Sequence, residues 1–199
     1  MNKQLINTLQ EKEERMIEIR RYLHQHPELS FKEQETPKYI ADFYKDKDCE
    51  VETNVGPNGA KVTIDSGKPG KTIAIRADFD ALPIQEATGL PFASKNEGVM
   101  HACGHDAHTA YMLILGETLI EIKDQFKGKV IIIHQPAEEM PPGGAQGMIK
   151  DGVLDGVDHV LGAHVMSTME AGKVFYREGF VQTGRAYFCL LYTSDAADE

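Results

Sequence analysis

Residues 129–135, with the sequence KVIIIHQ, form a nearly continuous apolar run, and this run constrains the fold more than any other feature. An apolar run of this length without alternating polar residues is typical of a strand that is buried on both faces. Residues 72–77 (TIAIRA) form a second short run that is rich in β-branched residues, and residues 158–164 form a third. We therefore expect three buried strands in one sheet.

Helical patterns alternate with these runs. Residues 106–122 place Met112, Leu115 and Leu119 on one stripe of a helix, and residues 145–150 have the length of a short helix. The order strand, helix, strand, helix, strand is typical of an α/β domain with a largely parallel sheet. We expect three layers, with helices on both faces of the sheet.

The first 65 residues are expected to add helices and a hairpin. Apolar residues at helical spacing predict one helix over residues 1–26, which Pro27 ends. Ser30 with Glu33 fits a capping box, and Thr36 fits the N-cap of a second helix that runs to about Tyr44. Alternating residues in 51–55 and 60–64, around a turn of glycine, proline and asparagine, predict a β-hairpin.

Length, charge and cysteine usage exclude several classes of protein. A chain of 199 residues fits one domain or slightly more. An excess of 31 acidic over 21 basic residues argues against a nucleic-acid partner. The apolar runs are too short to span a membrane and the start lacks an apolar signal segment, so we expect a cytoplasmic protein. Cys49, Cys103 and Cys189 are too scattered for a disulfide framework, and we interpret Cys49 and Cys189 as structural.

Residues with metal-binding side chains gather at the predicted strand ends. Six of the 8 histidines fall between residues 101 and 164. Ligands in open α/β sheets bind outside the carboxyl ends of the strands, so groups that follow different strands can meet at one edge. The groups in question are Asp78 and Asp80, the loop with Cys103 and His105, Glu138 and Glu139, and His164.

These residue types suit metal-assisted hydrolysis. Thiolate, imidazole and carboxylate are ligands of zinc and related metals, and one of two adjacent carboxylates can bind metal while the other accepts a proton. Two alternatives stay open at this point. Cys103 could be a nucleophile with His101, His105 or His108 as its base. The cluster could also belong to a metal-binding module without catalytic activity.

Five motifs together resemble the amidohydrolase branch of the M20 metallopeptidase family, which includes aminoacylases and hippurate hydrolases. They occur in the family's order and spacing, and the resemblance covers about residues 10 to 187. The motifs are residues 21–29 (RYLHQHPEL), 76–83 (RADFDALP), 100–108 (MHACGHDAH), 135–139 (QPAEE) and 162–164 (GAH).

The resemblance implies a zinc-peptidase-like catalytic domain that hydrolyses the amide bond of N-acyl amino acids with water activated at two divalent metal ions. It implies Glu138 as general base and Asp80 as the aspartate that orients a ligand. Asp78 stands where relatives outside this branch carry a metal-binding histidine. The metals implied are zinc, manganese, cobalt or nickel, and their implied ligands are Cys103, His105, Glu139 and His164.

The resemblance also implies what this chain lacks. Family members are about twice as long, insert a lid and dimerisation domain, and supply one more metal-binding histidine. We therefore expect residues 1–187 to be the first part of a catalytic domain, which reaches the lid near residue 180, and residues 188–199 to be a non-native tail. The fragment alone is expected to be inactive. The full-length protein is expected to act on a small N-acyl amino acid and to form a homodimer through the lid domain. N-acetyl-diaminopimelate deacetylation is the alternative within the family.

Overall fold

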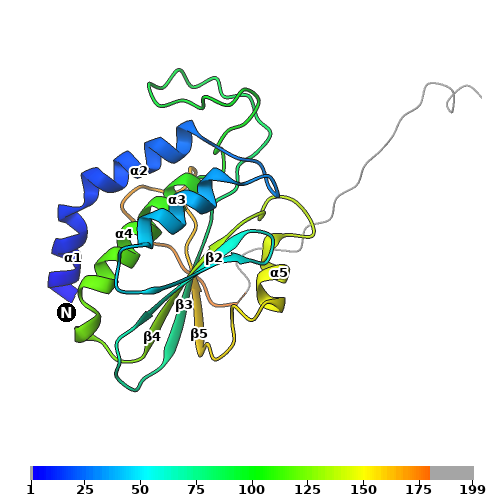
Figure 1. Cartoon of the computed structure of the whole chain (residues 1–199). Helices are drawn as coiled ribbons and strands as arrows, with labels where there is room; N and C mark the ends of the chain where they lie inside the picture. The colour runs from blue at the N-terminus through cyan, green and yellow to red at the C-terminus, as the bar shows by residue number, and fades with distance from the viewer. Residues whose placement is uncertain (1, 180–199) are drawn as a thin grey trace, which may run out of the picture. The chain divides into compact units, whose positions relative to one another are not determined.

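The computed structural model describes residues 2–179 (Figure 1). The chain divides into a unit of residues 1–166 and a second unit that begins at Ser167. Residues 167–179 of the second unit form turns and bends, with no helix or strand in that range. Cys189 and the predicted tail at 188–199 lie outside the described residues, so the predicted catalytic domain of residues 1–187 stays a prediction.

The first unit holds every helix and strand of the described residues. None of these helices is both long and apolar enough to span a membrane. In chain order the elements are α1 (Asn2–Glu11), α2 (Glu13–Gln25), α3 (Glu35–Tyr44), β1 (Glu50–Val55), β2 (Gly59–Asp65), β3 (Thr72–Asp78), α4 (His105–Glu121), the 3₁₀ turn η1 (Lys123–Gln125), β4 (Lys129–Gln135), α5 (Gly144–Lys150) and β5 (His159–Gly162).

The strands form one sheet in the order β1-β2-β4-β3-β5. β3 pairs in parallel with both β4 and β5, and the β1–β2 hairpin joins the sheet antiparallel to β4. In register, Asp78 lies opposite Gln135 and Arg76 lies opposite Gly162. The carboxyl ends of β3, β4 and β5 therefore meet at one edge of the sheet, which is where the predicted site residues follow.

Each face of the sheet carries its own hydrophobic core. Ile132 of β4 is fully buried against the core that α2, α3 and α4 cover. Its neighbours Ile131 and Ile133 point to the other face, where they pack with Met148 of α5. Figure 1 shows this separation, with α1–α4 on one side of the strands and α5 on the other. The predicted α/β fold, with a largely parallel sheet between two helical layers, is confirmed.

Two predictions for the N-terminal helices are wrong. The single helix expected over residues 1–26 is broken at Lys12, whose amide bonds to the carbonyl of Leu9 in a tighter turn. The second helix starts at Glu35 rather than after Thr36. The backbone amides of residues 34–36, at the start of this helix, all donate to the carboxylate of Glu28 at 2.8 to 3.0 Å. A carboxylate at this position also suits the positive end of the helix dipole.

The predicted capping box of Ser30 and Glu33 is also wrong. The Ser30 hydroxyl donates to Asp80 at 2.6 Å, and Glu33 accepts the amide of Ala137 at 2.8 Å. Both side chains lie in the segment between α2 and α3, and they bind segments that follow β3 and β4 rather than the start of α3. Glu33 is 3% exposed, and this burial raises the pKa of its carboxyl to about 7 against the backbone hydrogen bonds that lower it.

Glu117 of α4 holds the N-terminal helices in place. Its side chain is 9% exposed and meets Lys47 at 2.7 Å, Arg15 at 2.8 Å and Lys12 at 3.3 Å. Burial alone would raise the pKa of Glu117, but these three cations hold it at about 2. Lys12, which interrupts the first helix, therefore takes part in an ion-pair cluster with α4.

We predict that Glu117→Gln lowers the free energy of unfolding by about 1–3 kcal/mol at pH 7, because charged hydrogen bonds are lost from three cations. The folded-state pKa lies below the unfolded one, so this stabilisation is present above pH ~4.3 and is lost as the pH falls toward the folded value. Urea unfolding of the whole protein at several pH values measures both effects. Glu121→Gln is the control, since the Glu121 side chain is 49% exposed and, among the described residues, forms an ion pair only with Lys12. A loss of stability as large as that in Glu117→Gln would contradict the prediction.

A second prediction concerns Glu33, whose pKa is shifted in the opposite direction. Because its folded-state pKa is raised to about 7, its contribution to stability is full below pH ~4.3 and is lost as the pH rises through the folded value. Relative to Glu33→Gln, the wild-type protein should lose up to roughly 3 kcal/mol of unfolding free energy over this range, at about 1.4 kcal/mol per tenfold change in proton affinity.

Unfolding curves of the wild-type protein and Glu33→Gln between pH 4 and 8 test this difference. Glu18→Gln is the control, because Glu18 is an exposed carboxylate on α2 and its removal should not change the slope over this range. Parallel pH profiles for the wild-type protein and Glu33→Gln would contradict the assignment.

Candidate metal centre at the edge of the sheet

The structure brings the predicted site residues together at the carboxyl edge of the parallel strands. Three of them, Cys103, His105 and His164, each offer a ligand atom, and these atoms all lie within 4.8 Å of one another. A second group that meets the same limit consists of His105, Glu138 and Glu139. His105 belongs to both groups, so the ligand atoms form one continuous cluster.

His105 is fully buried at the first position of α4. Its Nδ1 lies 3.1 Å from Oδ1 of Asp80, and in the neutral imidazole a proton on Nδ1 that is donated there leaves Nε2 without one. Nε2 is buried without a hydrogen bond to the described residues, and it lies 3.8 Å from Oε1 of Glu139. A histidine that donates one N–H to a carboxylate and aims its other nitrogen into a cluster of ligands fits a metal site.

His164 and Cys103 are arranged in the same way. Nδ1 of His164 lies 2.6 Å from the carbonyl oxygen of Val165, to which it donates, and Nε2 lies 3.4 Å from Sγ of Cys103. Burial, a hydrogen bond with Glu139 and the charges of the nearby carboxylates together raise the pKa of the Cys103 thiol to about 12. The surplus of negative charge around this thiol favours a bound cation, which would stabilise the thiolate.

Asp80 connects three segments of the site. Besides His105, it receives the hydroxyl of Ser30 at 2.6 Å and the backbone amide of Glu139 at 2.9 Å. These donors hold its pKa below the usual range, although its burial acts in the opposite direction. Asp80 therefore orients one candidate ligand and fixes the backbone of another. The sequence analysis missed the role of Ser30 at this site, because a serine in the segment before a helix carries no signal of a distant partner.

Asp78 lies beside the cluster with partners of its own. His108 Nδ1 lies 2.6 Å from its Oδ1, and Arg76 Nη1 lies 2.6 Å from its Oδ2. Burial would raise the pKa of Asp78, but His108, His105 and Arg76 outweigh that effect and hold it below the usual range. The atoms of Asp78, His105 and His108 also satisfy the 4.8 Å limit. The guanidinium so close to Asp78 disfavours a cation at that third group.

The segment after β4 is shaped by an unusual backbone conformation. Ala137 has a φ of 50°, which is rare in a residue other than glycine. Its amide is held by the buried Glu33. This turn places Glu138 and Glu139 beside His105 rather than along the strand direction. Glu33 is thus a second residue that sequence reasoning missed.

A further buried network braces the start of α4. Asp106 follows His105 and binds Arg20 at 2.7 Å and His24 at 2.8 Å, both from α2. His101 lies close by and is 5% exposed, and burial lowers its pKa to about 4, so it stays neutral. This network gives His24 a structural role, because it links α2 to the start of α4.

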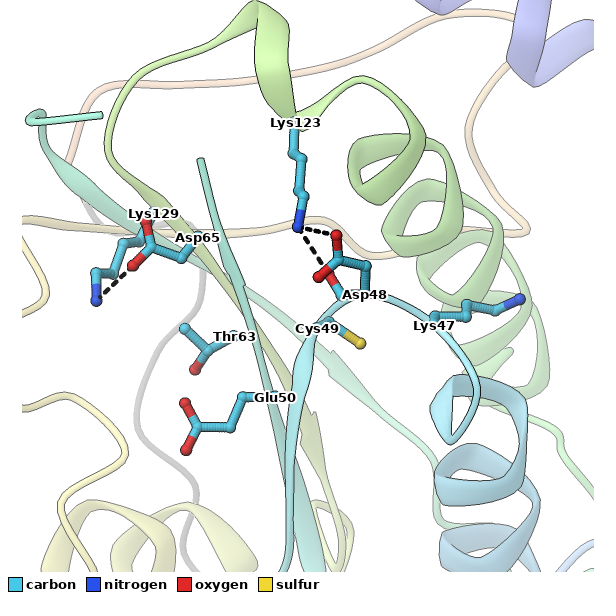
Figure 2. A pocket seen from close by; sticks show the side chains of 8 residues that line it. All are labelled: Lys47, Asp48, Cys49, Glu50, Thr63, Asp65, Lys123 and Lys129. Carbon is cyan, nitrogen blue, oxygen red and sulfur yellow. Dashed lines mark hydrogen bonds and ion pairs between the residues drawn. The ribbon is translucent and has the colours of Figure 1, made fainter. Parts of the chain in front are cut away.

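Figure 2 shows a pocket of about 330 Å³ that lies at the other end of the sheet, at the amino end of β4. Its charged residues neutralise one another, as in the pairs of Lys123 with Asp48 and Lys129 with Asp65. Cys49 lines it, half-buried, and burial raises the pKa of its thiol. Because none of the predicted site residues lies there, we place the functional site at the opposite edge.

Comparisons with known proteins agree with this placement. A crystallised protein from methicillin resistant Staphylococcus aureus is 79% identical, with a TM-score of 0.88 over 89% of this chain and 46% of that chain. The YXEP protein of Bacillus subtilis, described as a dinuclear metal binding peptidase from the M20 family, is 47% identical, with a TM-score of 0.72 over 75% of this chain and 42% of that chain.

A curated relative is the N-acyl-L-amino acid amidohydrolase of Geobacillus stearothermophilus, which is 43% identical over 80% of this chain and 43% of that protein. The chain spans about half the length of the curated relatives it matches. The family model for peptidase family M20/M25/M40 matches residues 74–187, more than half of the chain. With its α/β fold and the histidine, cysteine and carboxylate cluster at the sheet edge, the chain belongs to peptidase family M20/M25/M40.

Proposed function

We propose that the protein hydrolyses the amide bond of N-acyl amino acids at a centre of two divalent metal ions. The observation that carries this proposal is the position of Glu138, a carboxylate within 4.8 Å of the candidate ligand atoms of His105 and Glu139. A base beside a cluster of ligands is the arrangement that metal-assisted hydrolysis requires. The likeness to an N-acyl-L-amino acid amidohydrolase supports the substrate class.

We assign Cys103, His105, Glu139 and His164 as the metal ligands. The buried, unbonded Nε2 of His105 and the acidic surroundings of the Cys103 thiol both fit a bound cation. The mixed set of sulfur, nitrogen and oxygen donors suits zinc, cobalt, nickel or manganese. When bound, such metals polarise the scissile carbonyl and lower the pKa of water.

The chain's own residues account for the movement of protons. Glu138 accepts a proton from the attacking water and passes it to the amine nitrogen as the carbon–nitrogen bond breaks, which leaves a carboxylic acid and a free amino acid. Asp80 keeps the proton of His105 on Nδ1, so that Nε2 faces the ligand cluster. Deacylation of N-acetyl-diaminopimelate would use the same residues and the same chemistry.

The cysteine-nucleophile alternative fits the geometry less well. An activated thiol needs a pKa lowered by cationic neighbours, whereas burial and carboxylates raise the pKa of Cys103 to about 12. The alternative also leaves Glu138 and Glu139 without a role. A metal-binding module without activity is disfavoured because structural zinc sites usually draw on more cysteines than the single Cys103 found here.

We predict that Glu138→Gln lowers kcat for N-acyl amino acids by about 10²–10⁴-fold, the usual contribution of a general base, while metal content stays unchanged. Glu139→Gln, its matched neighbour, should instead lower the number of metals bound per chain, because it removes a proposed ligand. Steady-state kinetics together with elemental analysis of the purified whole protein separate the two effects. Near-normal turnover in Glu138→Gln would move the base to another residue.

We also predict that bound metal protects Cys103 from alkylation. In a Cys49→Ala/Cys189→Ala background, which leaves Cys103 as the only thiol among the three cysteines, iodoacetamide should label the chelator-treated protein and spare the metal-loaded one. The rate of labelling is measured by mass spectrometry. A nucleophilic cysteine would react in both states and lose activity as it does so, which is the outcome that would favour the alternative.

A further inference from the structure

The candidate ligand His164 lies on a segment with little packing of its own. It follows β5, the edge strand that pairs with β3 on one side, and all four residues of β5 are exposed. His164 is itself exposed. Something other than burial must therefore hold its imidazole against Cys103 and His105.

The neighbouring backbone is held by α4. The amide of Val165 donates to Nε2 of His108 at 2.9 Å, and the hydroxyl of Tyr111 donates to the carbonyl of Ala163 at 2.9 Å. His108 and Tyr111 are three residues apart, so they lie on the same face of the helix. Together they hold the backbone on both sides of His164.

The hydrogen bonds also define the tautomer of His108. An amide N–H can only donate, so Nε2 of His108 accepts and carries no proton. The proton of the neutral ring therefore lies on Nδ1, which donates to Oδ1 of Asp78 at 2.6 Å. Asp78 is in turn paired with Arg76. Both nitrogens of His108 are engaged, which separates this histidine from the proposed metal ligands.

Side-chain packing reinforces the same arrangement. The rings of His108 and His164 meet edge to face, with centroids 4.5 Å apart. Gly104, which precedes α4, adopts a φ of 85°, and a Cβ there would lie 2.4 Å from Cγ2 of Val165. A glycine at this position lets the segment approach the helix closely enough for the His108 bond to form.

We propose that His108 and Tyr111 are positioning residues that hold His164 in place for metal binding, and that Asp78 fixes the tautomer that lets His108 do so. This inference rests on the proposed function, because it takes His164 as a metal ligand. It assigns a purpose to a histidine of α4 that neither binds metal nor transfers a proton in the proposed reaction.

The test compares two substitutions of His108. In His108→Asn, the side-chain amide can still donate to Asp78 but is too short to reach Val165. In His108→Gln, the side-chain oxygen lies near the place of Nε2 and can accept the Val165 amide. Co²⁺ is the probe: calorimetric titration of the metal-free whole protein gives its affinity, and absorption spectra report the thiolate-to-cobalt band of Cys103 and the ligand-field bands.

We expect His108→Asn to weaken Co²⁺ binding about 10–100-fold, as loss of a residue that orients a ligand does, and to alter the ligand-field spectrum. His108→Gln should restore most of the affinity and the wild-type spectrum. His159→Asn, the same chemical change on the exposed first residue of β5, is the matched control and should bind Co²⁺ like the wild-type protein. If His108 only stabilised the fold, His108→Gln would not restore the Co²⁺ affinity, and His108→Asn would not alter the spectrum of bound Co²⁺.

The possible failures can be told apart. If the wild-type protein binds no Co²⁺, the proposed function itself fails. If the wild-type protein binds Co²⁺ and His108→Asn matches it in affinity and spectrum, the inference is overturned while the proposed function stands. If His108→Asn does not fold, Tyr111→Phe decides, because it removes the bond to Ala163 with little change in shape: a several-fold weaker affinity supports the inference and an unchanged one overturns it.

Discussion

Asp80 is the residue on which the rest of the candidate site depends. A buried carboxylate must be satisfied by donors, since an unpaired one would cost several kcal/mol. Its donors come from three separate segments: Ser30 after α2, His105 at the start of α4 and the amide of Glu139 after β4. Satisfying one charge thus brings three parts of the chain to a single point. The folding requirement and the geometry needed for metal binding are met by the same hydrogen bonds.

The sheet explains why distant residues can be arranged in this way. Because β3, β4 and β5 are parallel, their carboxyl ends lie side by side, and chemistry-bearing residues that follow each strand meet without long loops. The cost is an accumulation of negative charge from Asp78, Glu138 and Glu139. Arg76 offsets part of it. The proposed metal ions would offset the rest, which links stability at this edge to metal occupancy.

Elements with strong periodicity could be predicted from the sequence. The run at residues 129–135 matches β4 residue for residue, because a short apolar run rich in β-branched residues is typical of a buried strand. The hairpin and α4 also agree with prediction to within a residue or two. The residues expected at the site lie together because each follows a strand or opens a helix, and position alone was enough to group them.

Local patterns misled the prediction where tertiary contacts competed for the same side chains. Ser30 and Glu33 have the spacing of a capping box, yet each makes its hydrogen bond to a residue at least 50 positions away. Glu28 caps the start of α3 instead, because its carboxylate accepts hydrogen bonds from three backbone amides. A capping bond is worth about 1 kcal/mol, less than the cost of leaving the buried Asp80 or the Ala137 amide unpaired. The larger penalty decides which partner each side chain takes.

The candidate ligands differ in what holds each of them in place. His105 is fixed by burial in α4 and by Asp80, so its position follows from the fold. Glu139 is fixed through its backbone amide. His164 lies beyond an exposed edge strand, where neither burial nor strand pairing on both sides restrains it. A ligand in that setting must rely on contacts from a neighbouring rigid element, and α4, already anchored through Asp106 and Glu117 to the N-terminal helices, is the element that lies against it. The rigidity of the candidate metal site at its exposed side is therefore supplied by the packing of α4 against the N-terminal helices.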